Sequence, residues 1–272
     1  PDFTEERLAV TADGSLPPGL PWKDYLVSLF SSDAFMGSLG TLLQWGADKR
    51  YLNDGSRDAR TEEARVHNKG GAAIAFRAYE KRALPALASS VPPIFGDFEM
   101  SCFEKILSIA RSGDIDLRLV IAPMHGRYQE MLVMTGHWPS YEEWKRRLTA
   151  LVEAESNQTN APPFPLFDFG VYHDLTTDKV PESGLAPYYF EASHFTKRLG
   201  NEILNLVLAS SESRPAVSQG GFGHLLEPAS LEAPLEAIRI HQAGYQRTNE
   251  DELQSLRDLA GNQSPSPRAT SP

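Results

Sequence analysis

Two short apolar runs, "LRLVIAP" at residues 117–123 and "PLFDFG" at residues 165–170, constrain the fold more than any other feature of the chain. Each is continuous, is rich in β-branched or aromatic residues and ends at a turn residue, which is typical of buried parallel strands. Helical patterns precede, separate and follow them, at residues 97–112, 140–154 and 193–208. This alternation predicts an α/β fold, a three-layer sandwich whose parallel, flavodoxin-like sheet lies between helices.

The rest of the chain is predicted to complete one domain over residues 1–262. Helical patterns at residues 22–45 and 71–84 indicate a helical excursion near the N-terminus, and the polar stretch between them is expected on the surface. A long loop precedes one or two charged amphipathic helices over residues 231–261. Residues 263–272 are rich in Ser and Pro, which predicts a disordered tail.

Charge and composition disfavour several functions. The formal net charge of -10 argues against nucleic acid, because a duplex-binding surface needs clustered Lys and Arg. The richest basic cluster, Lys145 to Arg147, lies among acids and is predicted to be a solvated helix face. No apolar run reaches the length needed to cross a bilayer. The chain begins without Met and is expected to be a fragment or a processed product.

Metal and cofactor chemistry has no support in the residue patterns. Cys102 is the single cysteine, so no intramolecular disulfide and no paired-cysteine site can form, and its helical pattern predicts a buried thiol. The histidines show no metal-ligand spacing, and no glycine-rich loop joins a strand to a helix. We therefore predict neither a metal nor a cofactor.

The segment "YYFEASHFTKRLGNEIL", residues 188–204, contains the most informative candidate pair. Glu191 precedes His194 by three residues, a spacing at which a carboxylate can orient an imidazole that acts as general base. The same residues also suit a helix start, with Ser193 as N-cap and Glu191 favoured by the helix dipole. Spacing alone leaves both readings open.

Three further residues are candidates because parallel sheets gather their sites at the carboxyl ends of the strands. His125 follows the first strand and could bind substrate or support an oxyanion, although a plain strand-exit turn explains it equally well. Asp168 ends the second strand and could orient His194 in place of Glu191. Tyr189 belongs to an aromatic cluster that could stack on a sugar ring, or simply pack in the core. Ser56 is predicted to be a turn residue.

The segments "LRLVIAPMHGRY", "FDFGVYHDLTTDKVP" and "YYFEASHFTKRLGNEIL" together resemble the C-terminal part of the SGNH/GDSL hydrolase-like superfamily. They are most similar to its bacterial envelope branch, which includes alginate O-acetylation proteins. The resemblance covers about residues 97–208 and places His194 in the histidine position of the family's Asp-x-x-His motif. Glu191 stands where the family usually has Asp.

The resemblance implies an SGNH-type ester hydrolase or O-acyltransferase that acts on carbohydrate or an envelope polymer. It also implies a periplasmic or membrane-anchored location and partners in envelope polysaccharide synthesis. The family's Gly-Asp-Ser-type nucleophile turn has no counterpart here, so we expect the serine and its strand upstream of Pro1, and an exposed sheet edge in their absence. A rival hypothesis is a non-catalytic carbohydrate-binding or assembly module on the same scaffold.

Overall fold

The computed structural model describes residues 22, 26, 30–43, 58–90, 96–209 and 221–261. The chain divides into two compact units, Pro1–Asp58 and Ala59–Pro272. Ser56 and the predicted tail at residues 263–272 lie outside the described residues, and the single domain over residues 1–262 stays a prediction.

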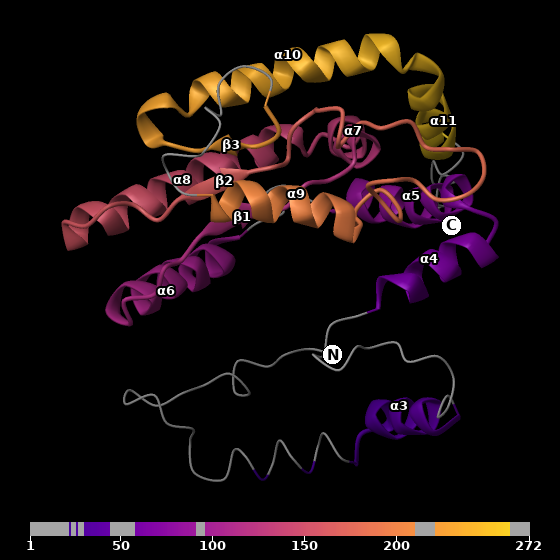
Figure 1. Ribbon diagram of the computed structural model, residues 1–272, viewed down its shortest axis with the longest axis horizontal. Helices are drawn as coiled ribbons and strands as arrows, with labels where there is room; N and C mark the ends of the chain where they lie inside the picture. The colour runs from indigo at the N-terminus through magenta and orange to yellow at the C-terminus, as the bar shows by residue number, and fades with distance from the viewer. Residues whose placement is uncertain are drawn as a thin grey trace, which may run out of the picture. The chain divides into compact units, whose positions relative to one another are not determined.

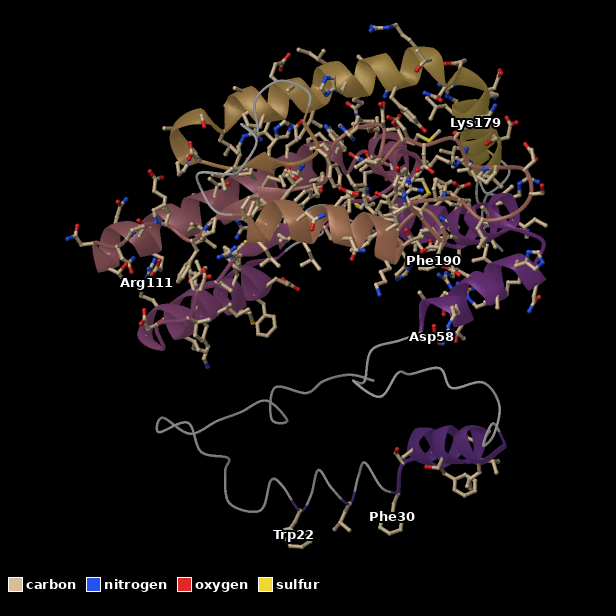
Figure 2. The ribbon with its side chains drawn as sticks, viewed as in Figure 1. Trp22, Phe30, Asp58, Arg111, Lys179 and Phe190 are labelled. Carbon is tan, nitrogen blue, oxygen red and sulfur yellow. The ribbon has the colours of Figure 1, made fainter. Side chains whose placement is uncertain are left out.

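In the first unit the predicted helix is present as α3 (Ser32–Leu43). The hydroxyl of Ser31 accepts a hydrogen bond from the N–H of Ala34 at 3.0 Å, which satisfies one of the otherwise unpaired donors at the helix start. Several large apolar side chains of this unit are exposed, among them Trp22 and Phe30 (Figure 2).

The second unit is built mainly of helices (Figure 1). In chain order its elements are α4 (Ala59–Asn68), α5 (Ala72–Ser89), α6 (Asp97–Ser112), β1 (Leu119–Ile121), α7 (Gly126–Met134), α8 (Trp138–Thr159), β2 (Leu166–Asp168), α9 (Lys197–Leu208), β3 (His224–Leu225), the 3-10 helix η1 (Pro228–Ser230), α10 (Glu232–Thr248) and α11 (Glu250–Gly261). Helix α4 lies inside the stretch that the sequence predicted as a polar surface excursion.

The predicted three-layer sandwich with a parallel sheet is wrong. Helices make up 65% of the described residues, and the described strands form one mixed sheet in the order β1-β2-β3. β1 and β2 are parallel, with Leu119 opposite Leu166, whereas β3 runs antiparallel to β2. The strands are short because their apolar runs end at turn residues within a few positions, while the helices continue for about two to six turns.

Strand β3 was not predicted, and its residues were assigned to a loop. His224 and Leu225 lie in a glycine-rich segment with no strand pattern, and they form a strand because β2 offers them a free edge. Gly223 precedes them at a φ of 87°, a conformation that favours glycine, and an added Cβ would lie 2.6 Å from the ring of Phe169.

Helices cover both faces of this small sheet. Ile121 and Leu166 belong to the apolar cluster that includes residues of α7, α8 and α10. Phe167, whose side chain points the opposite way, packs in a second cluster with Phe76 of α5 and Leu199 of α9. This alternation along β2 is the two-residue period of a strand, and it explains why the run is apolar on both sides.

Two helix starts differ from prediction. α8 begins at Trp138 rather than at Ser140, because Pro139 suits the first turn and the Trp138 indole donates to Glu142 at 2.9 Å. α9 begins at Lys197 with Thr196 as N-cap, rather than at Ser193. The residues before Thr196 are instead held by the backbone pairing of Tyr189 with Phe195.

Two burial predictions also fail. Cys102 is exposed, because α6 buries Met100, Leu107 and Ala110 and turns the neighbouring arc of its surface outward. Lys145 is buried rather than solvated, and its ammonium forms an ion pair with Asp168 at 2.6 Å. A helix-face pattern could not reveal this contact, because Asp168 comes from a strand 23 positions later in the chain.

Candidate active site

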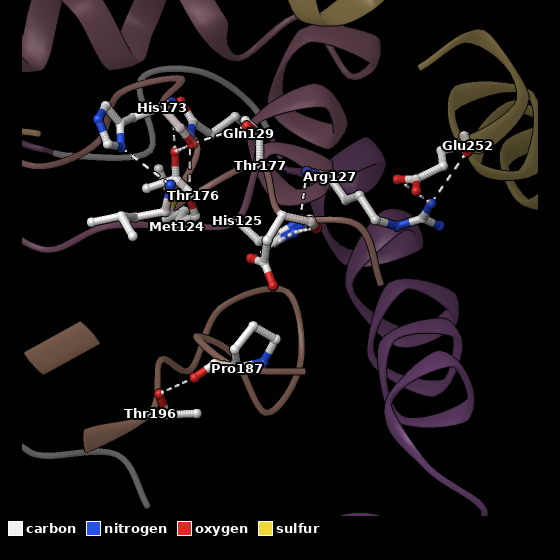
Figure 3. A network of polar contacts seen from close by, with 12 residues as sticks. Met124, His125, Arg127, Gln129, His173, Thr176, Thr177, Pro187, Thr196 and Glu252 are labelled. Atoms are coloured by element: carbon white, nitrogen blue, oxygen red, sulfur yellow. Dashed lines mark hydrogen bonds and ion pairs between the residues drawn. The ribbon is translucent and has the colours of Figure 1, made fainter. Parts of the chain in front are cut away.

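A short turn between β2 and α9 presents the Glu191–His194 segment. The N–H of Phe190 donates to the carbonyl of His194 at 2.9 Å, and the N–H of Thr196 donates to the carbonyl of Tyr188 at 2.8 Å. The Thr196 hydroxyl also donates to the carbonyl of Pro187 at 2.9 Å (Figure 3). These bonds close the turn on itself, so Glu191 and His194 are positioned by backbone pairing and not by a helix.

The structure brings Glu191 and His194 into direct contact, with Glu191 Oε1 hydrogen-bonded to His194 Nδ1. The two side chains differ sharply in exposure: Glu191 is 8% exposed and His194 is 75% exposed. A buried carboxylate beneath a surface imidazole is the arrangement by which an acid orients a catalytic histidine. The helix-cap reading does not hold, because α9 begins after both residues.

The contact also determines which imidazole nitrogen can take a proton. When Nδ1 carries hydrogen and donates to Glu191, Nε2 keeps its lone pair. Among the described residues no hydrogen bond occupies Nε2. The ring can therefore act as general base through Nε2 toward a hydroxyl that approaches from the surface.

Ser193 lies close to the pair but is not placed as its nucleophile. Its hydroxyl is 3.2 Å from Glu191 Oε1 and 3.1 Å from His194 Nδ1, and its N–H donates to Glu191 Oε2 at 3.3 Å. A serine nucleophile must face the nitrogen opposite the orienting acid, whereas Ser193 shares the Glu191 side of the ring. Its contacts hold the Glu191 carboxylate in place.

Two tyrosines that the sequence did not single out lie beside this pair. The ring of Tyr79, on α5, meets the His194 ring edge-on with centroids 6.5 Å apart, and Tyr128, on α7, lies 6.0 Å from Tyr79. Burial, the adjacent Tyr79 and the charge of Glu191 raise the pKa of Tyr128 to about 12. Sequence offered no signal for them, because Tyr79 and Tyr128 lie 115 and 66 positions before His194 in the chain.

Asp168 is fully buried at the end of β2 and is bound elsewhere. Its carboxylate pairs with Lys145 at 2.6 Å and accepts the N–H of Gly170 at 2.8 Å, while Lys145 also donates to the Gly170 carbonyl at 3.0 Å. Of the two candidate acids, the structure therefore brings Glu191 to the imidazole. Asp168 instead forms a buried ion pair at the C-terminal end of the central strand β2, and the Lys145 ammonium of that pair lies over the ring of Tyr141.

His125 occupies the N-cap of α7 and is buried. Its Nδ1 accepts the N–H of Arg127 at 3.2 Å, so Nε2 carries hydrogen and donates to the carbonyl of Asp178 at 2.9 Å (Figure 3). Burial lowers the pKa of His125 to about 4, and the charge of Arg127 acts in the same direction. His125 thus ties the loop after β2 to α7, and a direct contact with substrate stays a prediction.

Tyr189 is likewise buried, with its ring edge-on to His125 at a centroid distance of 5.2 Å. Its hydroxyl and both carboxyl oxygens of Asp178 have no hydrogen-bond partner within the described part of the chain. Burial raises the pKa of Asp178 to about 6, and the charge of Glu252 adds to this. Sugar stacking by Tyr189 stays a prediction. Phe190, which lies in the same turn as His194, is half-buried (Figure 2).

Comparisons with known proteins identify no relative. No family model, no curated protein and no solved structure matches the chain. Across the described ranges, no group of three or more His, Cys, Asp or Glu side chains is arranged to hold a metal ion. None of the described helices is both long and apolar enough to span a bilayer.

Proposed function

We propose that this chain belongs to an ester hydrolase or O-acyltransferase of the SGNH type that acts on carbohydrate or an envelope polymer. One observation carries the proposal: the exposed imidazole of His194 is held through Nδ1 by the buried carboxylate of Glu191. The resemblance of residues 97–208 to that superfamily supplies the reaction class, and the envelope location and polysaccharide-synthesis partners are part of the same proposal.

In this mechanism His194 Nε2 removes the proton from a hydroxyl nucleophile as it attacks the acyl carbon. Glu191 stabilises the imidazolium that forms, and Ser193 keeps the carboxylate aligned. The proton then passes from Nε2 to the departing alcohol. The nucleophilic serine is expected from outside the described residues, and no cofactor takes part in these steps.

The test is turnover of an acetylated oligosaccharide and of an aryl acetate by the full-length natural protein. His194→Ala is expected to lower kcat/KM by at least about 1,000-fold, as for loss of a triad member. His241→Ala, at an exposed histidine of α10, is the matched control and is expected to leave turnover unchanged. Equal turnover by His194→Ala and wild type would rule out the proposal.

Glu191 variants separate orientation from charge. Glu191→Gln keeps the side-chain length and is expected to lower kcat by about 100-fold or more, since it favours the wrong imidazole tautomer. Glu191→Asp, the residue usual in the family, is expected to retain more activity than Glu191→Gln. If Glu191→Gln were fully active, Glu191 would not be the orienting acid.

A second candidate is a non-catalytic carbohydrate-binding or assembly module. It is favoured by the lack, among the described residues, of any serine hydroxyl bonded to His194 Nε2. A fluorophosphonate probe, which labels activated serines, separates the two when it is paired with a binding titration of acetylated oligosaccharides. Binding without labelling supports the module, and labelling of a serine that His194→Ala abolishes supports the enzyme.

A further inference from the structure

A cavity of about 550 Å³ lies between α7, α10 and α11, whose places in the second unit Figure 1 shows. The residues that line it recur along each helix at spacings of three or four, so one face of each helix points into the same space. The volume is within the roughly 300–1,000 Å³ of sites that hold small molecules. Neither Glu191 nor His194 lines this cavity, so it is separate from the candidate active site.

The inner wall of the cavity carries the carboxylate of Glu130, a side chain of α7 that is 3% exposed. Its Oε1 accepts the hydroxyl of Tyr172 at 2.7 Å, and its Oε2 accepts the side-chain amide of Gln246 at 3.0 Å. Both donors are neutral, and within the described part of the chain Glu130 forms no ion pair with Lys or Arg. Burial raises the pKa of Glu130, against the two hydrogen bonds and the charge of Arg257.

The Glu130 carboxylate is held in place and still has room for a cation. An ionised carboxylate has about four acceptor positions, and the bonds from Tyr172 and Gln246 fill two of them. Gln242 donates to the Tyr172 hydroxyl at 3.0 Å, so the Tyr172 donor is itself fixed. A buried carboxylate without a counter-ion is costly, and a cation that reaches it from the cavity relieves that cost. The inner wall therefore favours a positively charged ligand group.

The rim of the cavity presents the opposite charge. Arg257 and Glu250 pair at 2.6 Å and neutralise each other. Arg247 follows Gln246 on α10, is exposed and forms no ion pair with any described residue. A guanidinium is always charged and can bind a carboxylate through two parallel hydrogen bonds. The rim therefore favours a negatively charged ligand group.

Apolar side chains form another part of the cavity wall. Val133 and Met134 of α7 are partly buried, and Leu253 of α11 is buried. Methionine is unbranched and flexible, so Met134 can adapt its shape to an apolar group placed against it. A ligand that matches the whole wall has an apolar body and carries one charge of each sign.

We propose that this cavity is a binding site for a short apolar peptide, a dipeptide in its smallest form. The ammonium of the peptide binds Glu130, its terminal carboxylate binds Arg247, and its side chains pack against Val133 and Leu253. A lone anion would meet the charge of Glu130, and a lone amine would leave Arg247 without a partner, so neither matches both charges. A single amino acid carries both charges on one carbon, whereas Glu130 is buried and Arg247 is exposed.

Isothermal titration calorimetry of the whole chain tests this site with dileucine and three analogues. N-acetyl-dileucine lacks the ammonium, dileucine amide lacks the carboxylate, and diglycine lacks the apolar side chains. Dileucine is expected to bind, and each analogue is expected to bind at least about tenfold more weakly, because each loses a charge pair or the apolar contact. No binding of dileucine at millimolar concentration, or equal binding of N-acetyl-dileucine, would overturn the proposal.

Variants of the chain assign each end of the peptide to its residue. In Glu130→Gln the loss of affinity on N-acetylation should disappear, and in Arg247→Ala the loss on amidation should disappear. Arg77→Ala removes an exposed arginine of α5 outside this cavity and should keep both losses. Arg247 is exposed, so Arg247→Ala keeps the fold even where Glu130→Gln, which alters a buried network, does not. If amidation still weakens binding to Arg247→Ala, dileucine binds elsewhere and the proposal is wrong.

Discussion

Replacing Asp178 by asparagine should stabilise the protein at neutral pH and not in acid. The Asp178 side chain is 13% exposed, and its carboxyl oxygens have no hydrogen-bond partner among the described residues. Burial and the charge of Glu252 raise its pKa from 3.8 to about 6. The folded state therefore favours the protonated carboxyl, so the stability it contributes is complete below pH 3.8 and is lost as the pH rises to 6.

The size of the effect follows from the shift. A pKa rise of about 2 corresponds to ~3 kcal/mol, which we reduce to about 2 kcal/mol because the side chain is partly solvated. Asp178→Asn keeps the shape of the neutral acid and removes the charge. We expect it to raise the free energy of unfolding by about 2 kcal/mol at pH 7.5, with little change at pH 3.8.

Urea unfolding of wild type and Asp178→Asn at the two pH values measures this difference. Asp174→Asn, at an exposed aspartate of the same loop, is the control and should change stability equally little at both. An Asp178→Asn variant that is stabilised equally at both pH values, or destabilised at pH 7.5, would refute the argument that a largely buried carboxylate without a hydrogen-bond donor opposes folding.

Two further predictions concern other buried titratable groups. Burial lowers the pKa of His125 to about 4, so the stability that its neutral form contributes is present above pH 6.5 and is lost as the pH falls toward 4. His125→Asn retains a side chain that can serve as N-cap of α7. This variant should flatten the pH dependence of the free energy of unfolding between pH 6.5 and pH 4. Lys145→Met leaves the Asp168 carboxylate buried without its partner at 2.6 Å and should lower the free energy of unfolding by about 3–5 kcal/mol, as measured by urea titration. Adding Asp168→Asn should recover part of that loss, and no recovery would mean that the ion pair is not what Lys145 supports.

Local sequence was enough to predict most elements of the second unit. The strands at β1 and β2 and the helices at α6, α8, α10 and α11 lie where apolar periodicity indicated them, because each pattern is set by residues a few positions apart. The Glu191–His194 contact was also predictable, since three residues of separation bring the two side chains within reach in a tight turn. The size of the sheet was not predictable, and the predicted three-layer sandwich was wrong, because the number of strands that pair cannot be read from the pattern of one strand.

Contacts between distant segments decided the rest. Lys145 and Asp168, or Tyr79 and His194, are far apart in the chain and meet only because helices pack on a shared sheet. The same packing buries His125 and Tyr189, leaves the Asp178 carboxyl oxygens without a hydrogen-bond donor among the described residues and turns one stripe of α6 outward. Periodicity predicts that a helix has an apolar face, whereas burial depends on whether another element arrives to cover it, and that is a property of the whole fold.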